Sequence, residues 1–426
     1  MSQYARFIGQ RARLRKPSPI RALMPLLKQP GVISLGGGLP NAAMFPFKQV
    51  KVVLNDGEET ELELADPQAA LQYSNTNGMP ELLAHLEVLQ KAFHGTVAQD
   101  KAEQSILVST GSQDALTKVM ELVLDEGESL LLEDYTYSGS LSFLQAYNCK
   151  LVPVRTDPAG ILPSSLRTIL DSWEPSQGKK PKVIYTIPTG SNPTGSSIDL
   201  ERRKELYAIA QEHDLLILED DPYYFMQFSK PWLPSLYSMD TDARVVRFDS
   251  CSKIFSSGLR IGFVTGPKEL IDLVGLHMQA TSLHTSGVSQ SMLIALFDHW
   301  KKTLSKDGRH GMLVGFEQHI DNVVDFYRER RDVFVGLAEK HLAGFCRWRV
   351  PDAGMFLWIE VLDCDDTEQL SMRLIQEEKV LVVAGTNFHP RSEKSCFIRV
   401  AYSTASDEQM DDALARFARL LQNRKN

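Results

Sequence analysis

Short apolar segments alternate with helical patterns between about residues 105 and 265. Several segments have the length and composition of buried strands: SILVS, SLLLE, KLVPV, KVIYTIP, LLILED, RVVRFD and IGFVTG. Helical patterns such as ALTKVMELV and ERRKELYAIAQEH lie between them. This alternation is typical of a mostly parallel central sheet with helices on both faces. The pattern therefore predicts a large α/β domain.

The C-terminal part of the chain follows a different pattern. A long helical pattern at about 315–342 precedes the strand-like segments GMFLWIEV, VLVVAG and CFIRVAYS. The final helix begins with a predicted capping box of Ser406 and Gln409. Its apolar stripe consists of Met410, Leu414, Phe417 and Leu421. We therefore expect an N-terminal arm at 1–45, a large domain at 46–314, and an interdomain helix with a small α+β domain at 315–426.

The composition excludes several classes of protein. A net charge of -8 argues against a nucleic-acid partner, because such a surface needs a basic field. The five cysteines form no C-x-x-C pair, so we expect neither a disulfide framework nor a metal site. No apolar run reaches the roughly 18 to 20 residues that span a bilayer, so we expect no membrane partner. These features indicate an intracellular protein that binds a small molecule.

The N-terminal segment is basic, and its first acidic residue is Asp56. The basic residues of its first part are Arg6, Arg11, Arg13, Arg15, Lys16 and Arg21. This bias is typical of a mitochondrial transit peptide, but an arm that folds onto the body of the protein has the same composition. The compartment therefore stays open between the cytoplasm and the mitochondrial matrix.

Polar residues follow two of the predicted strands at the sheet edge where ligands gather. After SILVS, Ser112 and Gln113 open a helix whose free backbone N–H groups offer an anion site, although an ordinary turn has the same pattern. After RVVRFD come Ser250, Ser252 and Lys253, and Arg260 follows. Such an amine can form an imine with a carbonyl cofactor, and the hydroxyls and the guanidinium can hold a phosphate. The alternative is a solvated lysine.

Two further strand ends carry candidate residues. Asp220 ends LLILE, where a carboxylate can pair with a protonated ring nitrogen, and Tyr223 follows it. Asn192, after KVIYTIP, can donate to a phenolate oxygen. Tyr137, after SLLLE, can stack on an aromatic cofactor. Each residue alone is equally typical of a turn or of plain packing.

Arg399 lies inside the apolar strand CFIRVAYS. A guanidinium there is costly unless an anion meets it. An internal carboxylate or a substrate can supply that anion, and the sequence leaves both readings open.

Together, S-x-S-K with an arginine seven residues later, D-x-x-Y upstream, N-P-T-G and a late strand arginine resemble the fold-type I pyridoxal-phosphate enzymes. The chain is most similar to the kynurenine and α-aminoadipate aminotransferases. The motifs that carry this resemblance include YARF, PSPIR, ISLGGGLPN, LQYS, TGSQ, EDDPYYF, GLRIGF, AGMFLWI and YSTAS. It extends from Tyr4 to about Leu420.

The resemblance implies pyridoxal 5'-phosphate as the cofactor, with Lys253 carrying it as a Schiff base and shuttling the proton of the reaction. Asp220 would hold the pyridinium proton, and Tyr137 would stack on the ring. Lys253, Asp220 and Tyr137 are therefore the expected catalytic residues. Tyr223 and Asn192 would bond the phenolic oxygen. The phosphate would be bound by Ser112, Gln113, Ser250, Ser252 and Arg260, and by Tyr73 of a neighbouring subunit, so that a homodimer is expected.

The resemblance also implies a substrate site. Arg399 would clamp the α-carboxylate of the substrate, Asn192 and Gly38 would line the site, and Arg21 on the arm would meet a distal carboxylate. The expected reaction is ping-pong transfer of the amino group of kynurenine, 2-aminoadipate or an aromatic amino acid to a 2-oxo acid, 2-oxoglutarate. The alternatives are a pyridoxal-phosphate-dependent β-lyase and a transcription regulator built on the same fold.

Overall fold

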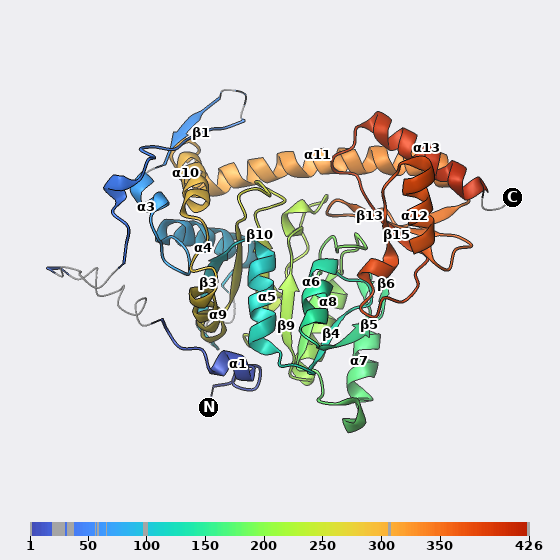
Figure 1. Cartoon of the computed structure of the whole chain (residues 1–426), viewed down its shortest axis with the longest axis horizontal. Helices are drawn as coiled ribbons and strands as arrows, with labels where there is room; N and C mark the ends of the chain where they lie inside the picture. The colour runs from blue at the N-terminus through green and yellow to red at the C-terminus, as the bar shows by residue number, and fades with distance from the viewer. Residues whose placement is uncertain are drawn as a thin grey trace. The chain divides into compact units, whose positions relative to one another are not determined.

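The protein is described by a computed structural model, in which two compact units can be recognised (Figure 1). The structure describes residues 2–18, 30–31, 38–55, 57, 59–64, 66–96, 101–305 and 308–423. Unit 1 comprises Met1–Asp125 and Asp240–His319, and unit 2 comprises Glu126–Met239 and Ile320–Asn426. The division into three parts that the sequence analysis expects stays a prediction. Within the described ranges, none of the helices combines the length and apolarity that a bilayer crossing requires.

Unit 1 is built on three strands of the central sheet. In it, β11 (Gly262–Pro267) pairs antiparallel with both β3 (Gln104–Ser109) and β10 (Val245–Ser250). Its helices are α1 (Gln10–Arg13), α3 (Pro67–Leu71), α4 (Pro80–His94), α5 (Ser112–Val123), α9 (Lys268–Ala280) and α10 (Gly287–Thr303), and a hairpin joins β1 (Lys51–Val53) to β2 (Glu61–Glu63). The antiparallel strand β11 makes the central sheet mixed.

Unit 2 contains four parallel strands in the order β9-β8-β4-β5. They are β4 (Ser129–Glu133), β5 (Lys150–Val154), β8 (Val183–Thr186) and β9 (Leu216–Asp220), with α6 (Ser138–Ala146), α7 (Pro163–Asp171) and α8 (Leu200–Glu212) in the connections. A short hairpin of β6 (Thr156–Asp157) and β7 (Gly160–Ile161) follows β5. Strands alternating with helices confirm the predicted α/β class.

The C-terminal part of unit 2 has its own antiparallel sheet in the order β12-β13-β15-β14. The strands are β12 (Cys346–Trp348), β13 (Phe356–Val361), β14 (Val383–Ala384) and β15 (Phe397–Ala401), and the helices are α12 (Thr367–Glu378) and α13 (Asp407–Asn423). The long helix α11 (Gly311–Leu342) leads into this part (Figure 1). Ser406 and Gln409 form the predicted capping box of α13. The predicted apolar stripe of α13 lies in a hydrophobic cluster with β13 and β15.

The described start of the N-terminal segment is part of the folded unit 1. Tyr4 and Phe7 are only 4% and 3% exposed, and the Tyr4 hydroxyl donates to the Ala243 carbonyl at 2.9 Å. Gly9 N donates to Leu122 O at 2.7 Å just before α1 begins. Of the two readings of the basic segment, these contacts favour an arm that folds onto the body, as far as residue 18. Arg21 lies outside the described residues.

Candidate functional site

In unit 1, a tight turn places Arg260 at the start of α5. Gly111, between β3 and α5, has a φ of +82°, and a Cβ there would lie 2.2 Å from Arg260 Nη2. A Cβ on Gly262 would lie 2.3 Å from the backbone nitrogen of Ser112. Glycine at both positions therefore lets the guanidinium and β11 approach the first residue of the helix. Free N–H groups at a helix start favour an anion, so this turn fits a phosphate.

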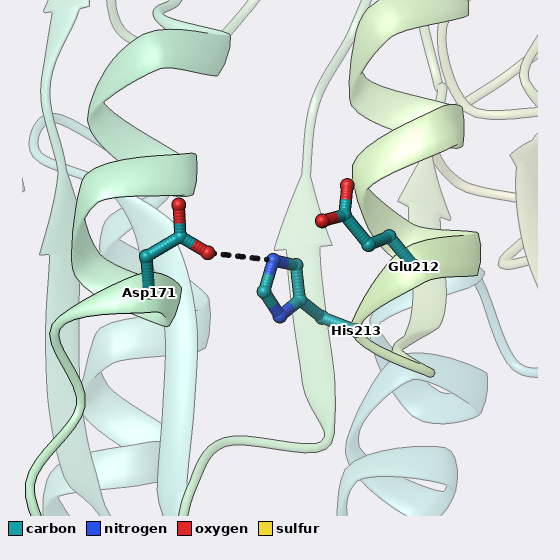
Figure 2. A group of neighbouring side chains, drawn as sticks. All are labelled: Asp171, Glu212 and His213. Carbon is teal, nitrogen blue, oxygen red and sulfur yellow. Dashed lines mark ion pairs between the residues drawn. The ribbon is translucent and has the colours of Figure 1, made fainter.

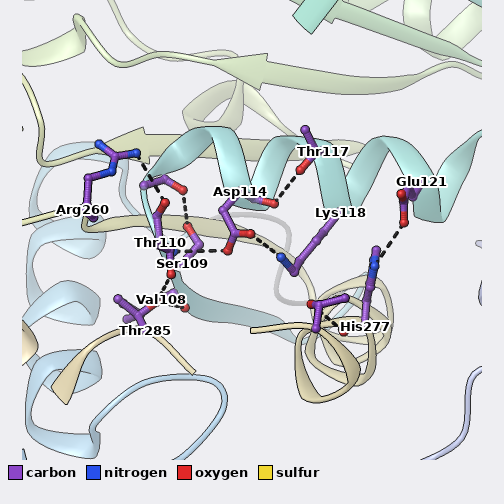
Figure 3. Close-up of polar contacts among 12 residues, drawn as sticks. Val108, Ser109, Thr110, Asp114, Thr117, Lys118, Glu121, Arg260, His277 and Thr285 are labelled. Atoms are coloured by element: carbon purple, nitrogen blue, oxygen red, sulfur yellow. Dashed lines mark hydrogen bonds and ion pairs between the residues drawn. The ribbon is translucent and has the colours of Figure 1, made fainter. Parts of the chain in front are cut away.

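Arg260 also contacts the segment that follows β10, which contains two serines. Its Nη1 donates to Ser252 Oγ at 3.3 Å, and its Nη2 donates to Thr110 O at 3.4 Å. The backbone nitrogen of Ser252 donates to Ser250 Oγ at 3.3 Å. Figure 3 shows the guanidinium beside Thr110 at the end of β3. The structure thus brings together Ser250, Ser252 and Arg260 near Ser112, as a donor-rich set that suits a dianion.

The polar contacts along α5 explain why its start is held firmly. Ser109 Oγ donates to Gly111 O at 2.9 Å, and Asp114 forms an ion pair with Lys118 one turn further (Figure 3). The backbone nitrogen of Thr110 donates to Asp114 Oδ2 at 3.2 Å. An Asp in the first turn also complements the helix dipole. The turn between β3 and α5 is therefore fixed before any ligand binds.

Unit 1 also contains four further candidate residues. Lys253 is half-buried in the turn that follows β10, directly after Ser252, and Gln113 is half-buried on α5. Tyr73 is 49% exposed and packs edge-on against His284. Gly38 is exposed, and a Cβ there would meet nothing within 4 Å. The roles of these residues stay predictions.

In unit 2, Asp220 lies at the end of β9 and is only 5% exposed. The hydroxyl of Tyr185, on the neighbouring strand β8, donates to Asp220 Oδ2 at 2.8 Å. Ser140 Oγ in turn donates to the Tyr185 hydroxyl at 3.1 Å. Burial and the negative charge of Asp220 raise the pKa of Tyr185 well above its usual range, so the hydroxyl stays protonated as a donor. The sequence analysis did not identify Tyr185 or Ser140.

Asn192 connects Tyr223 to Arg399 in the same unit. Arg399 Nη1 donates to Asn192 Oδ1 at 2.8 Å, and the Tyr223 side chain hydrogen-bonds Asn192. Burial raises the pKa of the Tyr223 hydroxyl, and the Asp220 carboxylate adds to the effect. Tyr137 lies directly before α6, with its ring over Gly139. The structure therefore brings Asp220, Tyr223, Asn192 and Arg399 together, as the sequence analysis expects.

Arg399 has unusual surroundings for a cation. Its guanidinium lies 4.4 Å from the centre of the Phe356 ring and 4.9 Å from that of Phe388. Burial lowers its pKa. Among the described residues, no carboxylate forms an ion pair with Arg399. Of the two readings of this arginine, the described residues offer no internal carboxylate, and the substrate reading stays a prediction.

A cluster of possible metal ligands lies elsewhere in unit 2. Asp171 at the end of α7 faces Glu212 and His213 at the end of α8 (Figure 2). His213 Nε2 lies 3.3 Å from Asp171 Oδ1, while Glu212 pairs with Arg167 at 2.7 Å. Lys180 Nζ lies 3.2 Å from His213 Nδ1. Because Glu212 is already paired with Arg167, the contacts describe a polar network that links α7 to α8.

Comparisons with known proteins agree with this picture. Residues 32–417 match the sequence model of the family described as aminotransferase class I and II. The chain is 41% identical to the mitochondrial kynurenine/alpha-aminoadipate aminotransferase of Bos taurus, over 98% of this chain and 99% of the relative. A solved aromatic aminotransferase of C. albicans is 27% identical and superposes with a TM-score of 0.86, over 99% and 98% of the two chains. A kynurenine aminotransferase of Pyrococcus horikoshii, solved with PMP, is also 27% identical and has a TM-score of 0.77, over 99% and 98%.

Proposed function

The chain belongs to the class I and II aminotransferase family, and on this premise we propose that it moves the amino group of kynurenine, 2-aminoadipate or an aromatic amino acid to 2-oxoglutarate. The protein is a pyridoxal-phosphate-dependent transaminase of the fold-type I class. Arg399 is the observation that carries the substrate assignment. Its half-buried guanidinium has no carboxylate partner among the described residues, and an amino acid or a 2-oxo acid would supply one.

The residues present fit the cofactor. The start of α5, Ser250, Ser252 and Arg260 offer donors to a dianionic phosphate, and a Cβ at Gly111 or Gly262 would fill this cradle. We assign Ser112, Gln113 and, from a second subunit, Tyr73 to the same phosphate. Lys253 would hold the cofactor covalently through its amine.

The bound cofactor supplies an electron sink that makes the Cα–H bond of the substrate acidic. Lys253 would remove and return the proton at Cα, which requires its amine to be neutral at that moment. The Asp220 carboxylate, held by the Tyr185 hydroxyl, would keep a proton on the ring nitrogen. Tyr223 and Asn192 would bond the phenolic oxygen, and Tyr137 would stack on the ring.

Substrate orientation would rest on Arg399, whose fork matches an α-carboxylate. Asn192 accepts a hydrogen bond from the guanidinium, and the rings of Phe356 and Phe388 pack against it. Gly38 would line the substrate site, and Arg21 would read a distal carboxylate.

The experiment follows the absorbance of the bound cofactor while kynurenine, 2-aminoadipate and an aromatic amino acid are added one at a time. Each is expected to convert the cofactor to its amino form, and 2-oxoglutarate is expected to reverse the change. Arg399→Ala should lower kcat/KM for all donors by about ten- to a hundredfold, because the α-carboxylate is common to them. Arg391→Ala, at an exposed arginine of unit 2, serves as the control. If none of the three donors changes the absorbance of the cofactor, the proposal is wrong.

We also propose that the active species is an intracellular homodimer, in the cytoplasm or the mitochondrial matrix. Tyr73 supports the dimer, because its ring is 49% exposed on unit 1 and would contact the phosphate site of a second copy packed against this unit. Light scattering during turnover tests it. An active species with the 47.8 kDa mass of one chain would contradict the dimer.

A further inference from the structure

Unit 2 contains a further concave site that none of the candidate cofactor or substrate residues lines. Its volume is about 570 Å³, within the range of about 300–1,000 Å³ that small-molecule sites occupy. Its walls come from residues 134–135 and 155–158, from the loop 194–196, and from β12, β13 and β15. We call it the aromatic cavity.

Three aromatic side chains form one wall of the aromatic cavity. The rings of Trp358 and Phe397 are stacked, with centroids 5.3 Å apart and planes 7° apart. Tyr135 meets both rings edge-on, at 5.2 Å and 5.6 Å, and its hydroxyl lies 3.0 Å from Ser395 Oγ. Contacts among these three side chains therefore hold the wall in place, and the wall is largely apolar.

Strand alternation shows that these rings do not belong to the core below the sheet. Leu357 and Ile359 on β13, and Ile398 on β15, are fully buried in the hydrophobic cluster of the C-terminal part. Trp358 and Phe397 alternate with them, so they lie on the opposite face and are only half-buried. Large aromatic rings lining a concave surface are typical of a binding site for a planar ligand.

Two arginines at the aromatic cavity have no partner for their charge. Arg155 and Arg347 are exposed, and among the described residues neither guanidinium forms a hydrogen bond or an ion pair. Arg349 differs, because its Nη1 donates to Pro158 O at 2.5 Å. Two planar donor forks thus border the aromatic wall and are available to an anion.

The carboxylates of the aromatic cavity are largely engaged. Asp157 accepts two bonds of 2.7 Å from Arg202. Asp134 accepts bonds from Thr156 N and Oγ1 at 3.2 Å and 2.5 Å, and burial raises its pKa. The third carboxylate is that of Glu360, which lies opposite Arg347 in the pairing of β12 with β13. Among the described residues, none of these three carboxylates forms an ion pair with Arg155 or Arg347, so both guanidinium forks remain available to a ligand.

We propose that the aromatic cavity binds a planar aromatic carboxylate at a site separate from the transamination site. The ring lies against Trp358 and Phe397, and the carboxylate is met by Arg155 and Arg347. The size fits a molecule of one or two fused rings. This inference does not rest on the proposed function, because no residue assigned to the cofactor or the substrate takes part.

The test uses 2-naphthoate as the probe, which has neither an amino group nor a 2-oxo group and so cannot be transaminated. Isothermal titration of the full-length holoenzyme should show one site per chain. The double variant Arg155→Ala/Arg347→Ala should weaken binding by about ten- to a hundredfold, the effect of a lost charge-assisted fork. Both side chains are exposed, so the fold should be retained, as circular dichroism would verify.

Three controls separate the outcomes. Arg373→Ala removes an exposed arginine on α12 of the same unit and should leave the affinity unchanged. The neutral analogue 2-naphthalenemethanol should bind far more weakly than 2-naphthoate. Saturating 2-aminoadipate, which would occupy the transamination site, should not displace the probe. Equal affinities of the double variant and the Arg373 variant would overturn the proposal, as would displacement by 2-aminoadipate or an absence of binding at millimolar probe.

Discussion

The hydrogen bond from Tyr185 to Asp220 leads to a prediction that tells whether Tyr185 positions the carboxylate or only packs in the core. Tyr185→Phe keeps the buried ring and removes only the hydroxyl, which donates to Asp220 Oδ2 at 2.8 Å. A hydrogen bond to a charged group contributes about 1.5–3 kcal/mol, so the ionised carboxylate should be destabilised by that amount. If Asp220 holds the ring-nitrogen proton through the transition state, kcat should fall by about ten- to a hundredfold. KM should change little, because Tyr185 lies behind the carboxylate.

Steady-state kinetics with one donor measures kcat for the wild type, Tyr185→Phe, Asp220→Ala and the double variant. Because Tyr185 acts through Asp220, the substitution should have no further effect once the carboxylate is gone. Ser140→Ala, which removes the bond of 3.1 Å to the Tyr185 hydroxyl, should have a smaller effect. Tyr402→Phe is the matched control, since it removes a buried hydroxyl bond of 3.0 Å to Gly354 O. An unchanged kcat in Tyr185→Phe, or an equal loss in the Asp220→Ala background, would refute the reasoning.

Three further substitutions test other parts of the argument. Lys253→Ala should abolish both transamination and the mass increase that borohydride reduction produces on the holoenzyme; a variant with full turnover would exclude the assignment. Burial raises the pKa of Glu133 from 4.5 to about 8. Between these two pH values the carboxyl group is protonated in the folded state but ionised in the unfolded state, so the free energy of unfolding falls as the pH rises. Glu133→Gln should flatten that fall in denaturant unfolding, and an unaltered slope would count against it. Arg21→Ala should lower kcat/KM for 2-aminoadipate by about ten- to a hundredfold and spare an uncharged donor, whereas equal losses for both would show that Arg21 does not read the distal carboxylate.

The strands and the residues at their ends could be predicted because buried strands have a strong local signal. The apolar segments before Asp220 and Lys253 correspond to β9 and β10, and the polar residues come directly after them. The direction of β11 was harder to predict, because an apolar run has no direction. The connection from β10 to β11 carried a signal for the antiparallel direction. Parallel strands need a crossover of about a dozen residues or more, which is usually helical. The connection before β11, which contains GLR, has no helix.

Tyr185 could not be identified from the sequence for a different reason. It lies inside KVIYTIP, where an aromatic residue is ordinary strand filler. Its role depends on the register of two parallel strands, in which Tyr185 lies opposite Leu218, two residues before Asp220. The aromatic cavity depends on register in the same way, because Glu360 lies opposite both Arg347 and Phe397 only after three strands have paired. Local patterns predict which residues end a strand, but not which side chains meet across strands.

Arg399 shows what the structure adds to readings that the sequence leaves open: among the described residues no carboxylate pairs with it, and its role as a substrate ligand stays a prediction. Taking a guanidinium partly out of water without a carboxylate beside it costs free energy, and Arg399 is half-buried. β15 instead offers the amide of Asn192 and the faces of two aromatic rings, which solvate the cation without neutralising it. Under the proposed function, a substrate carboxylate would offset this cost when it binds. The stability that β15 gives up by holding Arg399 would then return as affinity for the carboxylate.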